Sequence, residues 1–142
     1  MLYLLKRYPI SLFLGIAIWV VCLIPIVENP IPSLQLTDKW VHMMMYLTFT
    51  LTIWMESVRH QHRYRWSHLL LFGMALPIIM GGLVEIVQAT CTGGKRNGDW
   101  LDFCANAIGV CIAVILALTY YLITTRCKDE SATKHSKNGG HK

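Results

Sequence analysis

The stretch DWLDFCANAIGVCIAVILALTYYLIT, from Asp99 to Thr124, decides the fold. Its charged residues and its asparagine lie near its start, and a long apolar run follows them. A mainly apolar helix of about 20 residues is long enough to cross the hydrocarbon core of a bilayer. The stretch therefore predicts a membrane-spanning helix, about Trp100–Thr124, with a polar face at one end.

Three further stretches of the chain are interpreted in the same way: about Ile10–Val27, Lys39–Met55 and His68–Gln88. The stretch Lys39–Met55 is the least hydrophobic of them, and Pro77 is expected to kink the stretch that contains it. Together with the first stretch they predict an all-α fold, an integral membrane bundle of four transmembrane helices.

The composition supports one membrane domain. The chain has 142 residues, of which 54% are hydrophobic and 15% charged, whereas soluble domains carry about 25% charged residues. We expect a single transmembrane domain over residues 1–125 and a disordered polar tail over residues 126–142. The net charge of +5 does not indicate nucleic acid, because the basic residues gather in short segments between apolar runs.

The distribution of Lys and Arg predicts the orientation of the four expected spans. With the N-terminus inside, the inner segments hold ten of the 13 basic residues, and the outer segments hold Lys39, Lys95 and Arg96. The positive-inside rule then places both termini in the cytoplasm. Trp40 and Trp100 lie near span ends, where interfacial anchors are expected.

Asp38, His42 and Tyr46 follow one another at intervals of four residues, which puts them on one helix face. Asp38 could orient His42 and leave its other ring nitrogen free to act as a base, a metal ligand or a hydrogen-bond donor. The plainer interpretation makes Asp38 the N-cap of the helix and His42 an interfacial polar residue. We favour the cap for Asp38 and leave both alternatives open for His42 and Tyr46.

Glu85 and Gln88 lie at the outer end of the third expected span. Glu85 follows sixteen residues without a charge, Leu69 to Val84, so we expect it about one turn below the membrane surface. Such a carboxylate needs a partner or must reach the interface. A buried partner such as Arg96 is the favoured alternative.

Arg96, Asp99, Asp102 and Asn106 form the densest polar set, and the last three share one face of the fourth expected span. Asp99 suits an N-cap, and Asp102 three residues later suits the helix dipole. Capping does not explain Asn106, which lies two turns into the span. A stripe of small residues with four-residue spacing shares this span and predicts close helix packing: Ala105, Gly109 and Ala113.

The polar residues of these three expected spans all lie near the same membrane surface. The predicted orientation places that surface on the extracytoplasmic side. Ionisable groups in or beside membrane spans are costly, and their gathering indicates a functional site. The sequence contains no Ser-His-Asp arrangement, phosphate loop or zinc-spaced Cys/His cluster. His42, Glu85, Asp99 and Asp102 could bind a metal, but no spacing requires one, so we assign no metal ligand and leave any cofactor unknown.

Three segments resemble the VanZ-like family in order and spacing: DKWVHMMMYLTFTL (Asp38–Leu51), EIVQ (Glu85–Gln88) and RNGDWLDFCANAIG (Arg96–Gly109). The similarity covers about Pro32–Gly109, just over half of the chain. It implies a small polytopic protein of the bacterial cytoplasmic membrane. The founding member of that family gives low-level resistance to the glycopeptide teicoplanin. The motif positions that carry over are His42, Tyr46, Glu85, Gln88, Arg96, Asp102 and Asn106.

Three functional hypotheses follow. The first is a membrane protein that binds or modulates a cell-envelope component: a lipid headgroup, a lipid-linked cell-wall intermediate or a glycopeptide, with Arg96 contacting phosphate or carboxylate. The second is a membrane enzyme that acts on an outer-leaflet lipid-linked substrate by acid–base or metal-assisted chemistry. The third is a purely structural role, in which the polar residues hold three helices together. The spans could also assemble into a homodimer, and membrane lipids are partners in every case.

Overall fold

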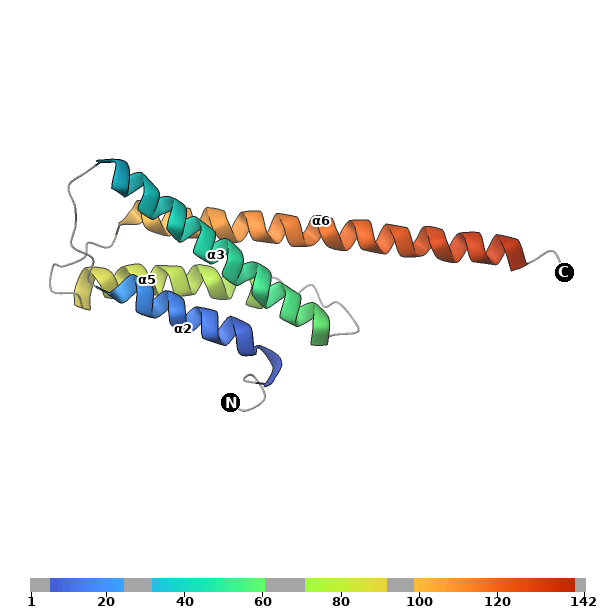
Figure 1. The fold of residues 1–142 in the computed structure, drawn as a ribbon, viewed down its shortest axis with the longest axis horizontal. Helices are drawn as coiled ribbons and strands as arrows, with labels where there is room; N and C mark the ends of the chain where they lie inside the picture. Colours follow the sequence, from blue (N-terminus) through green and yellow to red (C-terminus); the bar gives the residue numbers. More distant parts are fainter. Residues whose placement is uncertain (1–5, 25–31, 61–70, 92–98, 140–142) are drawn as a thin grey trace.

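The computed structural model describes residues 6–24, 32–60, 71–91 and 99–139, and these residues form helices without a strand (Figure 1). The α-helices are α2 (Pro9–Leu23), α3 (Pro32–His60), α5 (Leu76–Cys91) and α6 (Trp100–Gly139). A π-helical turn, η1 (Leu71–Ala75), leads directly into α5. The predicted all-α class is confirmed for this part of the chain.

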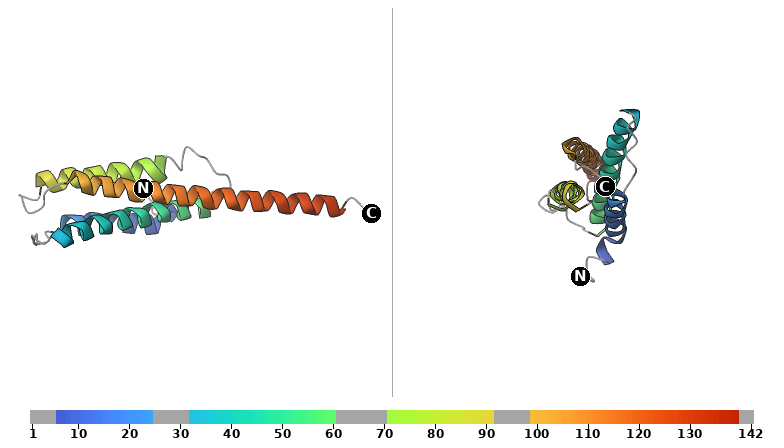
Figure 2. Two further views of the ribbon diagram at one scale, coloured as in Figure 1. Left: turned by 90° about the horizontal axis from the view of Figure 1, so that it is seen from above. Right: turned by 90° about the vertical axis from the view of Figure 1, so that its left-hand side faces the viewer.

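The helices alternate in direction along the chain, so their ends fall into two groups (Figure 1). At one end lie the C-termini of α2 and α5 and the N-termini of α3 and α6. The N-terminus of α2, the C-terminus of α3 and the turn η1 lie toward the other end, beyond which α6 projects. Seen from above, α5 and α6 lie on one side and α2 and α3 on the other (Figure 2).

The interface between α3 and α6 is the largest contact between two helices. Gly109 makes it close, because a Cβ at that position would overlap the carbonyl oxygen of Met43 on α3. Ala105 and Ala113 are also buried. The stripe of small residues therefore serves close packing, as the sequence predicts.

Pro77 produces a local change of helix type rather than a break. It lacks the N–H that would bond the carbonyl of residue 73, four positions earlier. Residues Leu71–Ala75 form the π-helical turn η1, and the α-helical pattern begins at Leu76. The structure thus has a π-helical turn just before the proline, and the predicted kink stays a prediction.

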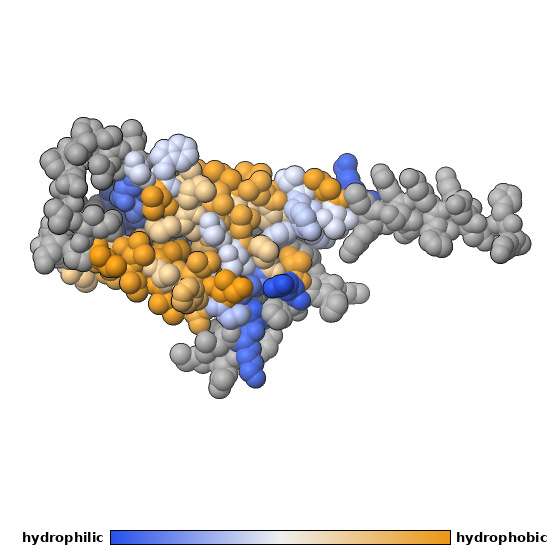
Figure 3. Space-filling view, viewed as in Figure 1, coloured by the Kyte–Doolittle hydropathy of each residue, from blue (hydrophilic) through white to orange (hydrophobic). Residues whose placement is uncertain are grey.

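Two helical segments are long and apolar enough to cross a membrane: Leu71–Cys91, which is η1 and α5 together, and Trp100–Arg126 of α6. Helix α2 is apolar but has 15 residues. Hydrophobic side chains cover the middle of the bundle, and strongly hydrophilic ones lie toward its ends (Figure 3). The third and fourth predicted spans thus have the expected length and composition, while four spans remain a prediction.

Two helix boundaries differ from the expectation. Helix α3 begins at Pro32, so Asp38 lies inside the helix and the prediction that Asp38 caps it is wrong. Proline suits the first turn of a helix, since its φ is preset and its missing N–H is not needed there. Helix α6 continues to Gly139, where a disordered tail is expected. No Pro or Gly interrupts residues 126–138, and Lys, Glu and Ala favour helix.

Candidate functional site

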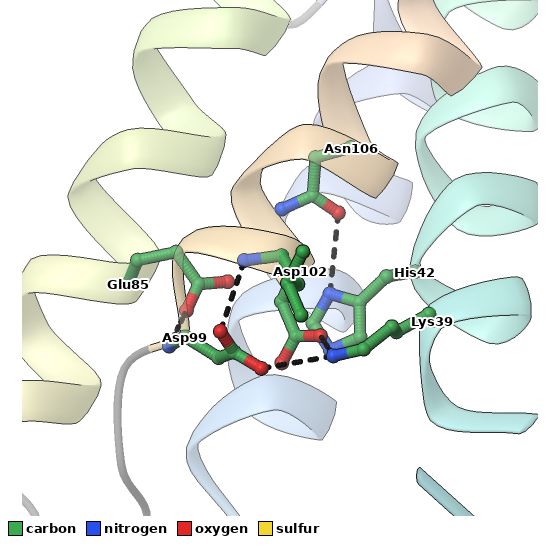
Figure 4. Close-up of polar contacts among 7 residues, drawn as sticks. Lys39, His42, Glu85, Asp99, Asp102 and Asn106 are labelled. Atoms are coloured by element: carbon green, nitrogen blue, oxygen red, sulfur yellow. Dashed lines mark hydrogen bonds and ion pairs between the residues drawn. The ribbon is translucent and has the colours of Figure 1, made fainter. Parts of the chain in front are cut away.

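Most of the predicted site residues meet at the bundle end that carries the N-termini of α3 and α6. Figure 4 shows side chains from α3, α5 and the start of α6 turned toward one another there. One further residue, Lys39, joins them. We call this set the polar cluster: Asp38, Lys39, His42, Glu85, Asp99, Asp102 and Asn106.

Lys39 joins α3 to the start of α6. Its ammonium nitrogen Nζ lies 2.9 Å from Oδ2 of Asp99 and 3.0 Å from Oδ1 of Asp102 (Figure 4). Sequence reasoning counted Lys39 only as an outer charge and missed this role. The signal was present, because Lys39 stands one turn before His42 on the same helix.

Asp99 caps α6, as the sequence predicts. Its Oδ1 accepts a hydrogen bond of 3.0 Å from the backbone N–H of Leu101, and its carbonyl accepts one of 3.2 Å from Phe103. The ammonium of Lys39, together with that Leu101 N–H, holds the pKa of Asp99 below its ordinary value. Asp99 therefore joins the helix cap to the polar cluster in its ionised form.

His42 and Asn106 form a buried pair across the interface of α3 and α6. Nδ1 of His42 lies 3.2 Å from Oδ1 of Asn106 (Figure 4), and the two residues are 2% and 1% exposed. With the amide oxygen of Asn106 toward the ring, Nδ1 is the donor, and in the neutral imidazole Nε2 carries the lone pair. The position of Asn106, which capping could not explain, is explained by this contact.

Glu85 and Gln88 are both buried on α5 but point to different neighbours. Oε2 of Glu85 accepts a hydrogen bond of 3.2 Å from the backbone N–H of Asp99. Arg96, the expected partner of Glu85, lies outside the described residues. The side-chain amide of Gln88 donates a hydrogen bond of 2.7 Å to the carbonyl of Cys22. Gln88 therefore attaches α5 to the end of α2 and lies apart from the polar cluster.

Tyr46 lies one turn deeper than His42 and is fully buried. Within the described part of the chain, its hydroxyl and Nδ2 of Asn106 have no hydrogen-bond partner. A Cβ added at Gly81 would lie 3.3 Å from the Tyr46 ring and 3.4 Å from the Asn106 amide. These two polar groups thus share a tightly packed region between α3, α5 and α6.

A cavity of about 300 Å³ opens between α5 and α6 beside the polar cluster. Glu85 and Asp99 supply its polar part. The rings of Trp100 and Phe103 meet edge to face, with 5.6 Å between their centroids, and form part of the cavity wall. Gly82, Ile86 and Ala89 line the rest. The cavity therefore offers a polar end and apolar walls, which suits an amphiphilic molecule.

Asp38, His42 and Asp102 form a group that sequence spacing did not predict. Each offers one ligand atom, and the three atoms lie within 4.8 Å of one another. Two of these residues come from α3 and one from α6. This geometry could hold a metal ion, although the sequence led us to assign no metal ligand.

The opposite end of the bundle holds one buried carboxylate that sequence reasoning did not single out. Glu56 on α3 is 5% exposed and caps the N-terminus of α2. Its oxygens accept hydrogen bonds from the N–H of Ile10 (2.9 Å), the N–H of Ser11 (3.0 Å) and the hydroxyl of Ser11 (2.5 Å). Helix α2 has no side-chain cap from its own N-cap residue, Tyr8, so Glu56 supplies one from a neighbouring helix.

Comparison with known proteins does not identify this chain: no family model, curated protein or solved structure matches it. The resemblance to the VanZ-like family therefore remains a prediction, and the site must be argued from its own geometry.

Proposed function

We propose that this protein is a VanZ-like protein of the bacterial cytoplasmic membrane that binds a cell-envelope component from the extracytoplasmic side. The observation that carries the proposal is the polar cluster at one end of the bundle, next to the amphiphilic cavity between α5 and α6. A bilayer-embedded molecule with a polar head could place its head at Glu85 and Asp99 and its apolar part along Trp100 and Phe103.

Exposure of apolar side chains supports the membrane setting. In the most apolar 18-residue part of Leu71–Cys91, 33% is buried inside the bundle, and in that of Trp100–Arg126 only 22% is buried. Large apolar side chains also lie on the surface: Ile79 is 60% exposed and Ile115 is 61% exposed. In a soluble monomer so large an apolar surface would promote aggregation, whereas lipid tails solvate it. We propose that α2 and α3 complete a bundle of four spans.

The positions of the basic residues support the proposed orientation. Lys6 and Arg7 precede α2 and Arg59 lies near the end of α3, which puts them at the Glu56 end. Among the described residues at the other end, Lys39 is the one Lys or Arg. The positive-inside rule therefore favours a cytoplasmic Glu56 end and an extracytoplasmic polar cluster.

Cysteine labelling tests this orientation. Cys91 is exposed at the end of α5 next to the polar cluster, and Cys127 follows the apolar part of α6. In single-cysteine variants, a membrane-impermeable maleimide added to whole cells should label Cys91 and spare Cys127 until the cells are opened. The reverse pattern would place the polar cluster in the cytoplasm and contradict an outer-leaflet ligand.

A susceptibility panel in a sensitive bacterial host tests the ligand. We expect the native protein to protect selectively against teicoplanin, with vancomycin and a detergent as comparison challenges. Glu85→Gln and His42→Ala should remove protection at equal membrane abundance, whereas Glu56→Gln, at the opposite end, should retain it. Absence of protection by the abundant native protein would contradict glycopeptide modulation.

One observation favours the second candidate, a membrane enzyme acting on an outer-leaflet lipid-linked substrate. His42 contacts Asn106 through Nδ1 and has Asp38 and Asp102 close to it, which is an arrangement suited to acid–base chemistry. Incubation of the purified protein with bacterial envelope lipids, followed by mass spectrometry, would show a product. Turnover that falls about 10²–10⁴-fold in His42→Gln would support the enzyme, and unchanged lipids would exclude turnover of those lipids.

A further inference from the structure

We propose that Asp38, His42 and Asp102 bind one divalent transition-metal ion between α3 and α6. The inference requires neither the membrane orientation nor an envelope ligand, because it rests on the ligand atoms alone. Zn²⁺ and Mn²⁺ are the ions that best suit one imidazole nitrogen with two carboxylates.

The distances between the ligand atoms are close to those of a metal site. The three atoms lie within 4.8 Å of one another. Tetrahedral metal–ligand bonds of about 2.0–2.2 Å place two ligand atoms of one ion about 3.3–3.6 Å apart. The side chains of Asp38 and Asp102 would therefore have to rotate and bring the ligand atoms about 1 Å closer to one another when an ion binds.

The contact between His42 and Asn106 prepares the imidazole for a metal. Metal-bound histidines donate their other ring N–H to a carbonyl or carboxylate, which fixes the tautomer. Nδ1 of His42 lies 3.2 Å from Oδ1 of Asn106, and His42 is 2% exposed. In the neutral imidazole Nε2 then keeps its lone pair for the ion, and the ring is held by a residue outside the ligand set.

The charges around the group permit a dication. Asp38 and Asp102 supply two negative charges and balance it. The ammonium of Lys39 lies 3.0 Å from Oδ1 of Asp102 and would repel the ion. Its charge is shared with Asp99 at 2.9 Å, which reduces that repulsion. Lys39 is also the competing occupant: if it alone satisfies Asp102, no ion binds.

The test is a titration of the purified full-length protein with Mn²⁺ or Zn²⁺ alone, in detergent or lipid nanodiscs. The background variant removes adventitious binding by histidine and cysteine. Every cysteine is replaced with serine, and every other histidine is replaced with glutamine: His60, His62, His68, His135 and His141. Electron paramagnetic resonance of Mn²⁺ and calorimetry with Zn²⁺ should each give one equivalent. With Co²⁺, visible absorption should report a site containing His42.

Three substitutions in this background test the site. His42→Gln should abolish stoichiometric binding, and Asp38→Asn should weaken it at least tenfold while the protein stays folded. Lys39→Gln should tighten binding, because the repelling charge is gone. Absence of one-to-one binding overturns the proposal. If His42→Gln does not fold, unchanged affinity in Asp38→Asn overturns it equally.

Discussion

The two ends of the helix bundle use buried carboxylates in different ways. At one end, Glu56 accepts three hydrogen bonds from the start of α2, so this carboxylate is used entirely for structure. At the other end, the polar cluster gathers four carboxylates, a lysine, a histidine and an asparagine. The hydroxyl of Tyr46 and Nδ2 of Asn106 have no hydrogen-bond partner among the described residues, and toward the Glu56 end the same holds for Oγ1 of Thr50 and Nε1 of Trp54.

This difference separates a structural carboxylate from a candidate site. A buried polar group without a hydrogen bond costs about 1–3 kcal/mol, and stability alone would not favour retaining two of them. Burial of Glu56 is explained by the three hydrogen bonds that its carboxylate accepts. The unsatisfied Nδ2 belongs to Asn106, which contacts His42 in the polar cluster, so the need for a further partner arises next to the candidate site. Substitutions at the two ends should therefore have opposite consequences for stability and binding.

The largest effect should come from Gly109, where α6 packs closely against the backbone of α3 next to His42. In Gly109→Val, the side chain would collide with the Met43 carbonyl and push α3 and α6 apart. We expect a loss of about 3 kcal/mol in the free energy of unfolding and loss of metal binding, measured by thermal unfolding and titration in detergent. Gly82→Ala is the matched control, because its Cβ would meet Phe103 at an ordinary 3.5 Å. A fully stable Gly109→Val would contradict the close α3–α6 contact.

Glu56→Ala tests the structural end. It leaves the backbone N–H groups of Ile10 and Ser11 without their acceptor in a buried position, so the protein should lose about 2–3 kcal/mol of stability. Glu56→Gln retains one acceptor oxygen and should lose less. Unfolding by heat or SDS measures both variants. Metal affinity and teicoplanin protection should remain native in Glu56→Gln, and their loss would show that the two ends are coupled.

The sequence predicts the parts of the fold that depend on local pattern. Apolar length and composition located α5 and α6, and the good N-cap at Asp99 located the first residue of α6. The start of α3 was missed, because Pro32 begins the helix inside a segment whose prolines suggested a loop. The polar composition after Thr125 suggested disorder, although no Pro or Gly lies between Thr125 and Gly139.

The sequence predicted most residues of the site but not which of them contact one another. Spacing put His42 and Asn106 each on an inward helix face, yet only the crossing of α3 and α6 brings them together. The role of Lys39 also depends on that crossing. Glu56 was overlooked because a carboxylate near a span end is ordinary, and its partners lie 45 and 46 residues away in the sequence. Such pairings are tertiary and leave no periodic signal.

Tyr46→Phe sharpens the comparison, since it removes a buried hydroxyl that has no partner within the described chain. We expect the free energy of unfolding to stay equal or to rise by up to about 1 kcal/mol. If the hydroxyl serves the ligand, teicoplanin protection should fall at the same time. Unfolding curves and the susceptibility panel measure the two effects. A clear loss of stability would mean that the hydroxyl has a structural partner, and the contrast with Glu56 would fail.

The smallest effect should come from the ion pair of Asp99 and Lys39. The Asp99 side chain is 44% exposed, so Asp99→Asn, which can still cap α6, should cost well under about 1 kcal/mol. The pKa of Asp99 is lowered in the folded protein. Ionised Asp99 therefore adds to the free energy of unfolding above its ordinary pKa of 3.8, and this contribution disappears as the pH falls below that value. Unfolding between pH 3 and pH 7 should show this dependence in the native protein and lose it in Asp99→Asn. An identical dependence in both would assign the acid sensitivity to other carboxylates of the polar cluster, and Asp99 would then be a helix cap alone.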